Sequence, residues 1–181
     1  MKTRLRLLIT LGTVAALTAA CNPFGTNSRT QYPEDPRFAE FTYGTDGEIE
    51  VQERTDSLNE RWPGLKATEG HVTVEYSPSG LLPSPDPEFW LTGVATVPDD
   101  TITALMEGTT DSTLLPGIYP GLYQYVPQDC HFSTIDPAHA KQVLKGDDMQ
   151  VNKEFGTLPV EELAASSDCN LVVVTGEGVF G

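Results

Sequence analysis

Residues 89–97 read FWLTGVATV, and this stretch decides the fold. It is rich in aromatic and β-branched residues, which favour strands. Because the side chains of a strand alternate between its two faces, Phe89 and Leu91 point one way, and Trp90 and Val94 the other. Both faces are therefore apolar, which predicts a strand at the centre of a sheet. Gly93 indicates a bulge or a close approach of another backbone.

Further strands are expected on both sides of this stretch. Residues 48–53 (EIEVQE) and 71–76 (HVTVEY) alternate between apolar and polar positions, as half-buried strands do. Strands are also predicted over residues 129–135, 149–155 and 170–176.

Two short helices are predicted between the strands. After Pro98, Asp99 is a capping residue and Gly108 a stop. In the second helix, Asp136 is the N-cap, Pro137 the first helical residue and Gly146 the stop. Two short helices are too few to cover both faces of a parallel sheet. The sequence therefore predicts an α+β fold with a mainly antiparallel sheet.

The composition suits one globular domain. The chain has 181 residues, and its 14 prolines and 16 glycines indicate many turns. A net charge of −15 repels nucleic acid phosphates and anionic headgroups, which argues against a nucleic acid partner. The acidity is typical of a protein kept soluble in salty surroundings, and recognition of cations or a basic partner is the alternative.

An export signal is predicted over residues 1–20. Residues 1–6 (MKTRLR) are basic, and residues 7–20 (LLITLGTVAALTAA) are uncharged and apolar or small, as in a signal peptide. Removing this segment takes away three basic residues and no acid, which changes the net charge from −15 to −18. Residues 21–40 are expected to form a flexible tether, and residues 41–181 a single extracytoplasmic domain.

Cys21 follows Leu17-Thr18-Ala19-Ala20 and resembles the lipid-attachment cysteine of bacterial lipoproteins. Thr18 stands where the commonest form of that motif has leucine. The resemblance implies cleavage before Cys21, a diacylglycerol group on its sulfur, and a protein held on the extracytoplasmic face of the cell membrane. Ordinary secretion with an unmodified Cys21 is the alternative.

Cys130 and Cys169 remain when Cys21 carries lipid. An even pair outside the cytoplasm favours a disulfide, and closing a loop of about 40 residues stabilises a fold by roughly 4 kcal/mol. A catalytic thiol is the competing interpretation, and it needs a nearby base.

The chain also resembles a group of small acidic lipoproteins of high-GC Gram-positive bacteria. The resemblance rests on FWLTGVATVPDDTITALM, PGIYPGLYQYVPQDCHFSTID and DCNLVVVTG. That group is largely uncharacterised, so the resemblance implies a location and a compact domain and carries over no catalytic residue.

The run from Tyr119 to Pro127 is the most distinctive segment of the domain. Its prolines predict a rigid loop, in which Tyr119, Tyr123 and Tyr125 form either a ligand surface or a plug over the sheet. Trp62 and Trp90 are expected in the core, with a surface anchor as the alternative.

Catalytic and metal-binding patterns are weak. His71, His131 and His139 could bind zinc only if the fold brings them together. The acid pairs Asp147-Asp148 and Glu161-Glu162 fit solvated turns better than a calcium loop. We therefore predict no cofactor, no metal and no enzyme, but a membrane-anchored binding or interaction module whose partner is an envelope protein or a small ligand. The alternatives are a secreted hydrolase or metal enzyme built on His131 and His139, and a structural or inhibitory envelope protein.

Overall fold

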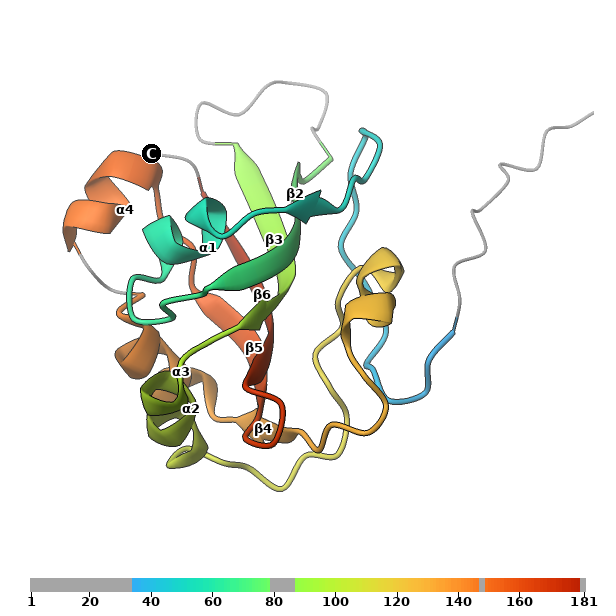
Figure 1. Cartoon of the computed structure of the whole chain (residues 1–181). Coiled ribbons are helices and arrows are strands. Elements are labelled where there is room, and N and C mark those ends of the chain that lie inside the picture. The colour runs from blue at the N-terminus through green and yellow to red at the C-terminus, as the bar shows by residue number, and fades with distance from the viewer. Residues whose placement is uncertain (1–33, 79–86, 147–148, 180–181) are drawn as a thin grey trace, which may run out of the picture. The chain divides into compact units, whose positions relative to one another are not determined.

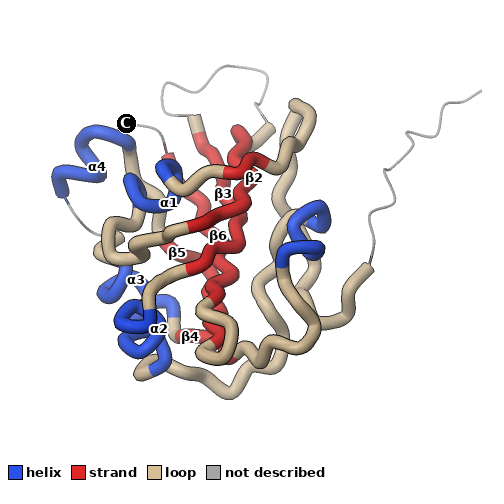
Figure 2. Tube along the Cα trace, in the orientation of Figure 1, coloured by secondary structure: helices blue, strands red, loops and turns tan. Residues whose placement is uncertain are grey.

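The computed structural model describes residues 34–78, 87–146 and 149–179. The predicted signal peptide, Cys21 and Asp147-Asp148 lie outside the described residues. The described chain forms one six-stranded sheet with short helices around it (Figures 1 and 2).

The sheet is antiparallel throughout, in the strand order β1-β2-β3-β6-β5-β4. Its strands are β1 (Gln52–Glu53), β2 (Glu69–Tyr76), β3 (Glu88–Thr96), β4 (Ser133–Ile135), β5 (Val160–Ser166) and β6 (Leu171–Val179). The stretch quoted first is β3, which lies between β2 and β6 as predicted. The α+β class with a mainly antiparallel sheet is therefore confirmed.

One face of the sheet is covered by helices. These are α1 (Asp56–Arg61), α2 (Asp99–Met106), α3 (Pro137–Leu144) and α4 (Met149–Phe155), which lie together on one side in Figure 1. Asp136 caps α3 as predicted, because its Oδ1 accepts a 2.9 Å hydrogen bond from the His139 backbone N–H. The core on this face includes Leu58, Trp62 and Leu91.

The opposite face of the sheet is covered by a 3₁₀ helix, η1 (Pro120–Tyr125), and by the segment over residues 34–51 (Figure 1). Here Val94 and Val173 of the sheet pack against Ile118 and Leu122. Both sets of β3 side chains are therefore buried, each under a different layer.

Gly93 marks a close approach and not a bulge. It pairs regularly with Val72 on one side and Val174 on the other. A Cβ atom added at Gly93 would lie 3.1 Å from the Val72 side chain and 3.4 Å from that of Leu58 in α1. The missing side chain lets α1 pack directly on the centre of the sheet.

Both tryptophans lie in the core, as expected. Trp62 is 0% exposed and donates a 2.9 Å hydrogen bond to the Leu158 carbonyl oxygen. Trp90 is also buried and donates to the Gly44 carbonyl oxygen at 2.7 Å. Each indole N–H therefore has a partner, which burial requires.

Four predicted elements differ from the structure. Residues 149–155, expected as a strand, form helix α4, in keeping with the helix-forming tendency of Met, Gln, Lys and Glu. The strand expected over 48–53 is reduced to Gln52–Glu53, and that expected over 129–135 to Ser133–Ile135. The tyrosine run, expected as a loop, forms η1.

Several elements were not predicted from the sequence. Strand β5 (VEELAAS) contains helix-forming residues. It is extended because it lies between β4 and β6 and forms hydrogen bonds with both. It also carries Glu161 and Glu162, which are exposed on a strand and not in a turn. Helix α1 was missed as well, so the described chain has four α-helices and one 3₁₀ helix where two helices were expected.

The packed fold begins before residue 41. Phe38 is 6% exposed, and the Ala39 N–H donates to the Leu115 carbonyl oxygen at 2.9 Å. The Leu115 N–H in turn donates to the Arg37 carbonyl oxygen at 2.8 Å. Residues 34–40, which we expected in the tether, are thus an ordered arm of the domain.

Candidate functional site

The three candidate tyrosines lie in η1 or directly before it. A 3₁₀ helix has three residues per turn, so Tyr119, Leu122 and Tyr125 fall on one line along it. Tyr123 lies a third of a turn away. The segment therefore does not present one continuous tyrosine surface.

Tyr119 belongs to the core. It is 8% exposed, and its ring meets that of Phe41 edge-on with centroids 5.8 Å apart. The Tyr119 backbone N–H donates to Thr92 Oγ1 at 3.2 Å. This tyrosine plugs the sheet and is not available to a ligand.

Tyr123 stacks on the N-terminal arm. Its ring lies 4.3 Å from that of Phe38, at an interplanar angle of 16°. Burial raises the pKa of the Tyr123 hydroxyl, and the nearby Asp35 carboxylate raises it further. A hollow of about 400 Å³ lies beside this stack, among acidic and aromatic residues of the arm.

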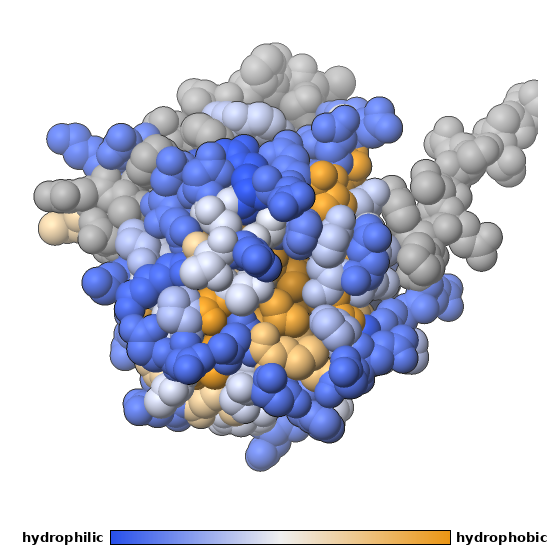
Figure 3. All heavy atoms as spheres, viewed as in Figure 1, coloured by the Kyte–Doolittle hydropathy of each residue, from blue (hydrophilic) through white to orange (hydrophobic). Residues whose placement is uncertain are grey.

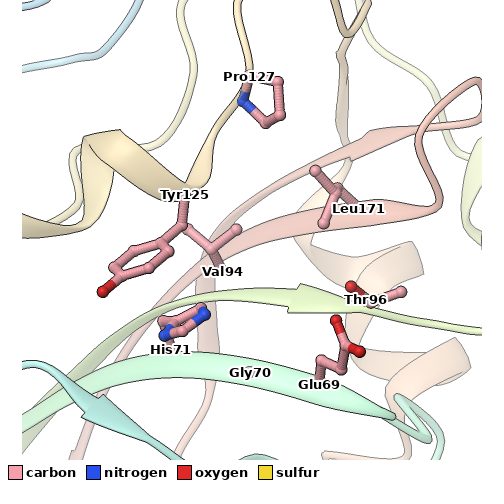
Figure 4. Close-up of a pocket in the computed structure, with 8 residues that line it drawn as sticks. All are labelled: Glu69, Gly70, His71, Val94, Thr96, Tyr125, Pro127 and Leu171. Carbon is pink, nitrogen blue, oxygen red and sulfur yellow. The ribbon is translucent and has the colours of Figure 1, made fainter.

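Tyr125 stacks on His71 of β2, with ring centroids 3.5 Å apart and an angle of 9°. The pair forms one wall of a hollow of about 250 Å³, which we call the Tyr125 hollow (Figure 4). The hollow is lined by Glu69, Gly70, His71, Val94, Thr96, Tyr125, Pro127 and Leu171.

The strand register explains the floor of the Tyr125 hollow. Glu69 of β2 lies opposite Thr96 of β3, and Thr96 lies opposite Leu171 of β6. His71 is two residues from Glu69, so both side chains point to the same face. Figure 4 shows Glu69 and Thr96 at one end of the hollow and the stacked His71 and Tyr125 at the other.

The polar side chains of the Tyr125 hollow are not used by the fold. Among the described residues, the Glu69 carboxylate, the His71 ring nitrogens and the Thr96 hydroxyl have no hydrogen-bond or ion-pair partner. Nearer the middle of the same face, Thr73 and Thr92 bond each other at 2.7 Å. The hollow therefore leaves polar groups free for a ligand.

Two braces fix the roof of the Tyr125 hollow. Arg37 of the arm donates 3.0 Å hydrogen bonds to the carbonyl oxygens of Val126 and Pro127. The predicted disulfide joins Cys130, three residues after Pro127, to Cys169, two residues before Leu171. The disulfide thus connects the segment after Pro127 to the strand that carries Leu171. The hollow is therefore preorganised for a ligand.

His131 lies beside the disulfide in a second polar cluster. His131 Nδ1 lies 2.8 Å from Asp168 Oδ2, and the same carboxylate accepts hydrogen bonds from the Ser166 hydroxyl and the His131 backbone N–H. These hydrogen bonds, that of Ser166 above all, hold the pKa of Asp168 well below its usual range. Since Asp168 lies between Ser166 and His131, the imidazole cannot activate the hydroxyl as in a hydrolytic triad.

His139 does not join the Asp168 cluster. His131 precedes β4 and His139 follows it in α3, where His139 Nε2 lies 2.8 Å from the Ala104 carbonyl oxygen of α2. His71 stacks on Tyr125. The fold thus does not unite the three histidines. Within the part of the chain that the structure describes, no group of three His, Cys, Asp or Glu could hold a metal ion.

Comparison with known proteins assigns no relative. No protein-family profile, no curated protein and no solved structure matches the chain. None of the helices in the described ranges is both long and apolar enough to cross a membrane.

Sequence reasoning missed most of the Tyr125 hollow. It singled out Tyr125 and His71, but for different chemistry, it treated Pro127 only as part of a rigid loop, and it assigned no role to Glu69 and Thr96. These residues lie up to about 60 positions apart and meet only through strand register and the covering η1. No local spacing in the sequence signals such a site.

Proposed function

We propose that this protein is a lipoprotein, anchored through Cys21 on the extracytoplasmic face of a membrane, whose domain binds a ligand or partner in the Tyr125 hollow. The observation that carries the binding function is the set of unpartnered polar side chains around a hollow whose roof is braced by Arg37 and by the disulfide. A role limited to the fold needs no such hollow over the sheet.

Two observations support the location. Disulfides persist in oxidising surroundings outside the cytoplasm, and the domain contains one. The sequence before the domain has a basic start, an uncharged run and a cysteine after two alanines. The described fold starts 13 residues after Cys21, and an extended chain of that length reaches up to about 45 Å.

The anchor is tested by mass spectrometry of the protein purified from a Gram-positive host. We expect the first 20 residues to be absent and a diacylglyceryl group on Cys21. A Cys21→Ser variant should leave the membrane fraction, while a Ser28→Cys control keeps the native pattern. An unlipidated Cys21 in the native protein would remove the anchor from the proposal.

Binding is tested on the full-length protein in detergent micelles by amide chemical shifts. A small set of cationic, anionic, aromatic and neutral polar compounds serves as the probe. At least one class should shift the amides of residues 69–71, 94–96 and 125–127, and a Tyr125→Ala variant should lose the response. If no compound class moves these amides, the binding function is wrong and a structural role takes its place.

A further inference from the structure

The polar end of the Tyr125 hollow has the chemistry of a cation site. Glu69 supplies a negative charge, and the Thr96 hydroxyl and an unprotonated His71 nitrogen can accept hydrogen bonds. Glu69 and Thr96 are directly opposite each other on β2 and β3, so their polar atoms can reach one ligand group. No lysine or arginine lines the hollow to neutralise Glu69.

The rest of the hollow suits an aliphatic chain. Val94 and Leu171 form its apolar floor, and Pro127 its roof (Figure 4). The ring of Tyr125 also lines the hollow. A ligand with a hydrocarbon stem and a cationic head thus meets an apolar and an acidic part in the same hollow.

The size of the hollow limits the occupant. Its volume of about 250 Å³ is smaller than the roughly 300–1,000 Å³ of usual small-molecule sites. One long side chain of a protein partner is a suitable occupant. A guanidinium group is the better match among cations, because its planar fork pairs with a carboxylate through two hydrogen bonds and stacks on aromatic rings.

The surrounding charge favours the same partner. Four basic side chains of the described domain already have a partner. Arg37 pairs with Asp35, Arg54 with Asp56 and Lys66 with Asp100, and Arg61 lies over the Phe89 ring. The whole chain carries 26 acidic residues against 11 basic ones. Figure 3 shows hydrophilic residues over most of one face, with apolar residues gathered toward its middle. The excess of acidic residues in the chain attracts a basic partner over long range.

We propose that the Tyr125 hollow receives an arginine side chain from a basic partner protein, with its guanidinium on Glu69 and Thr96 and its stem on Val94, Leu171 and Pro127. This inference rests on the proposed binding function and names the partner's chemistry.

The test uses two peptides that differ only in charge. Acetyl-Gly-Arg-Gly-amide carries the guanidinium, and its citrulline counterpart has the same shape without the charge. Each is titrated into the full-length protein in micelles, and the amide shifts of residues 69–71, 94–96, 125–127 and 171 are followed. The arginine peptide should move these amides, and the citrulline peptide should bind at least about fivefold more weakly.

Variants separate the specific site from general acidity. Glu69→Gln keeps the shape of the side chain and should weaken the arginine peptide about threefold to tenfold. Glu107→Gln, at the end of α2 on the helix-covered side, removes the same charge elsewhere and should change affinity less than twofold. A lysine peptide should bind more weakly than the arginine peptide, because an ammonium lacks the planar fork.

The outcomes distinguish this inference from the binding function itself. Equal binding of arginine and citrulline peptides at the hollow would overturn the cationic partner and leave the binding function standing. Equal effects of Glu69→Gln and Glu107→Gln would reduce the interaction to non-specific attraction and also overturn it. If neither peptide reaches the hollow, the arginine inference is wrong, and the wider set of compounds decides the binding function independently.

Discussion

Arg37 donates a 3.0 Å hydrogen bond to the carbonyl oxygen of Pro127, 90 residues later in the chain. The same guanidinium donates to Val126 and pairs with Asp35 at 2.8 Å. One side chain of the arm thus holds the segment that roofs the Tyr125 hollow. The ordered arm is therefore part of the candidate site, although the sequence places it next to the tether.

Replacing Arg37 with Met should destabilise the domain, because two carbonyl oxygens lose a charged donor while the apolar stem remains. We expect a loss of about 1–2 kcal/mol in the free energy of unfolding, measured by urea denaturation. Arg54→Met is the matched control, since its ion pair with Asp56 is exposed and should cost less than about 0.5 kcal/mol. Equal losses in both variants would contradict the role given to Arg37.

The tyrosines of the η1 segment should separate into structural and surface classes. Tyr119→Ala empties a buried site and should cost about 3 kcal/mol or more. Tyr125→Ala, at a partly buried position over His71, should cost about 1 kcal/mol while abolishing the ligand response. Thermal and urea unfolding measure the stabilities. A Tyr125→Ala loss as large as that of Tyr119→Ala would make both residues part of the core.

Asp168 should make the domain less stable in acid. Its pKa is lowered in the folded protein, by the hydrogen bonds from Ser166 and then His131, from an ordinary value of 3.8. Its contribution is therefore complete above the unfolded-state pKa and is lost progressively as the pH falls from about 4 toward the lower folded-state pKa. The free energy of unfolding should fall less steeply over this range in Asp168→Asn than in the native protein.

Urea unfolding between pH 2 and 7 measures the difference between these two proteins. Asp129→Asn, an exposed aspartate beside Cys130, is the control for a general change of charge. A gap between native protein and Asp168→Asn that stays constant down to pH 2 would show that the Asp168 cluster contributes nothing through its charge.

Gly64 should tolerate no side chain. A Cβ atom there would overlap the Val143 carbonyl oxygen and lie 2.8 Å from Leu144 Cα, at the end of α3. Gly64→Ala should therefore cost about 2 kcal/mol or more. At Gly146, the nearest atom to an added Cβ is Trp62 Cδ1 at 3.6 Å, an ordinary contact, so Gly146→Ala should change stability by less than about 1 kcal/mol. Denaturation curves of both variants check the contrast, and similar losses would refute it.

The sequence by itself determined the features that depend on neighbouring residues. The apolar residues on both faces of the stretch 89–97 predicted the central strand, because a strand buried on both sides needs apolar groups on both. Asp136 and Pro137 predicted the start of α3, because a helix N-terminus needs a side-chain acceptor within a few residues. The even pair Cys130 and Cys169 predicted the disulfide by count and expected compartment alone.

Only the tertiary structure decided the features that depend on distant residues. Strand β5 is extended because β4 and β6 supply its hydrogen-bond partners, against the local preference of its Glu, Leu and Ala residues. The tyrosines separated because their neighbours differ: Tyr119 meets Phe41, Tyr123 stacks on Phe38 of the arm, and Tyr125 stacks on His71 of β2. The Tyr125 hollow exists because strand register sets Glu69 beside Thr96 and the two braces hold Pro127 above them, which no local pattern encodes.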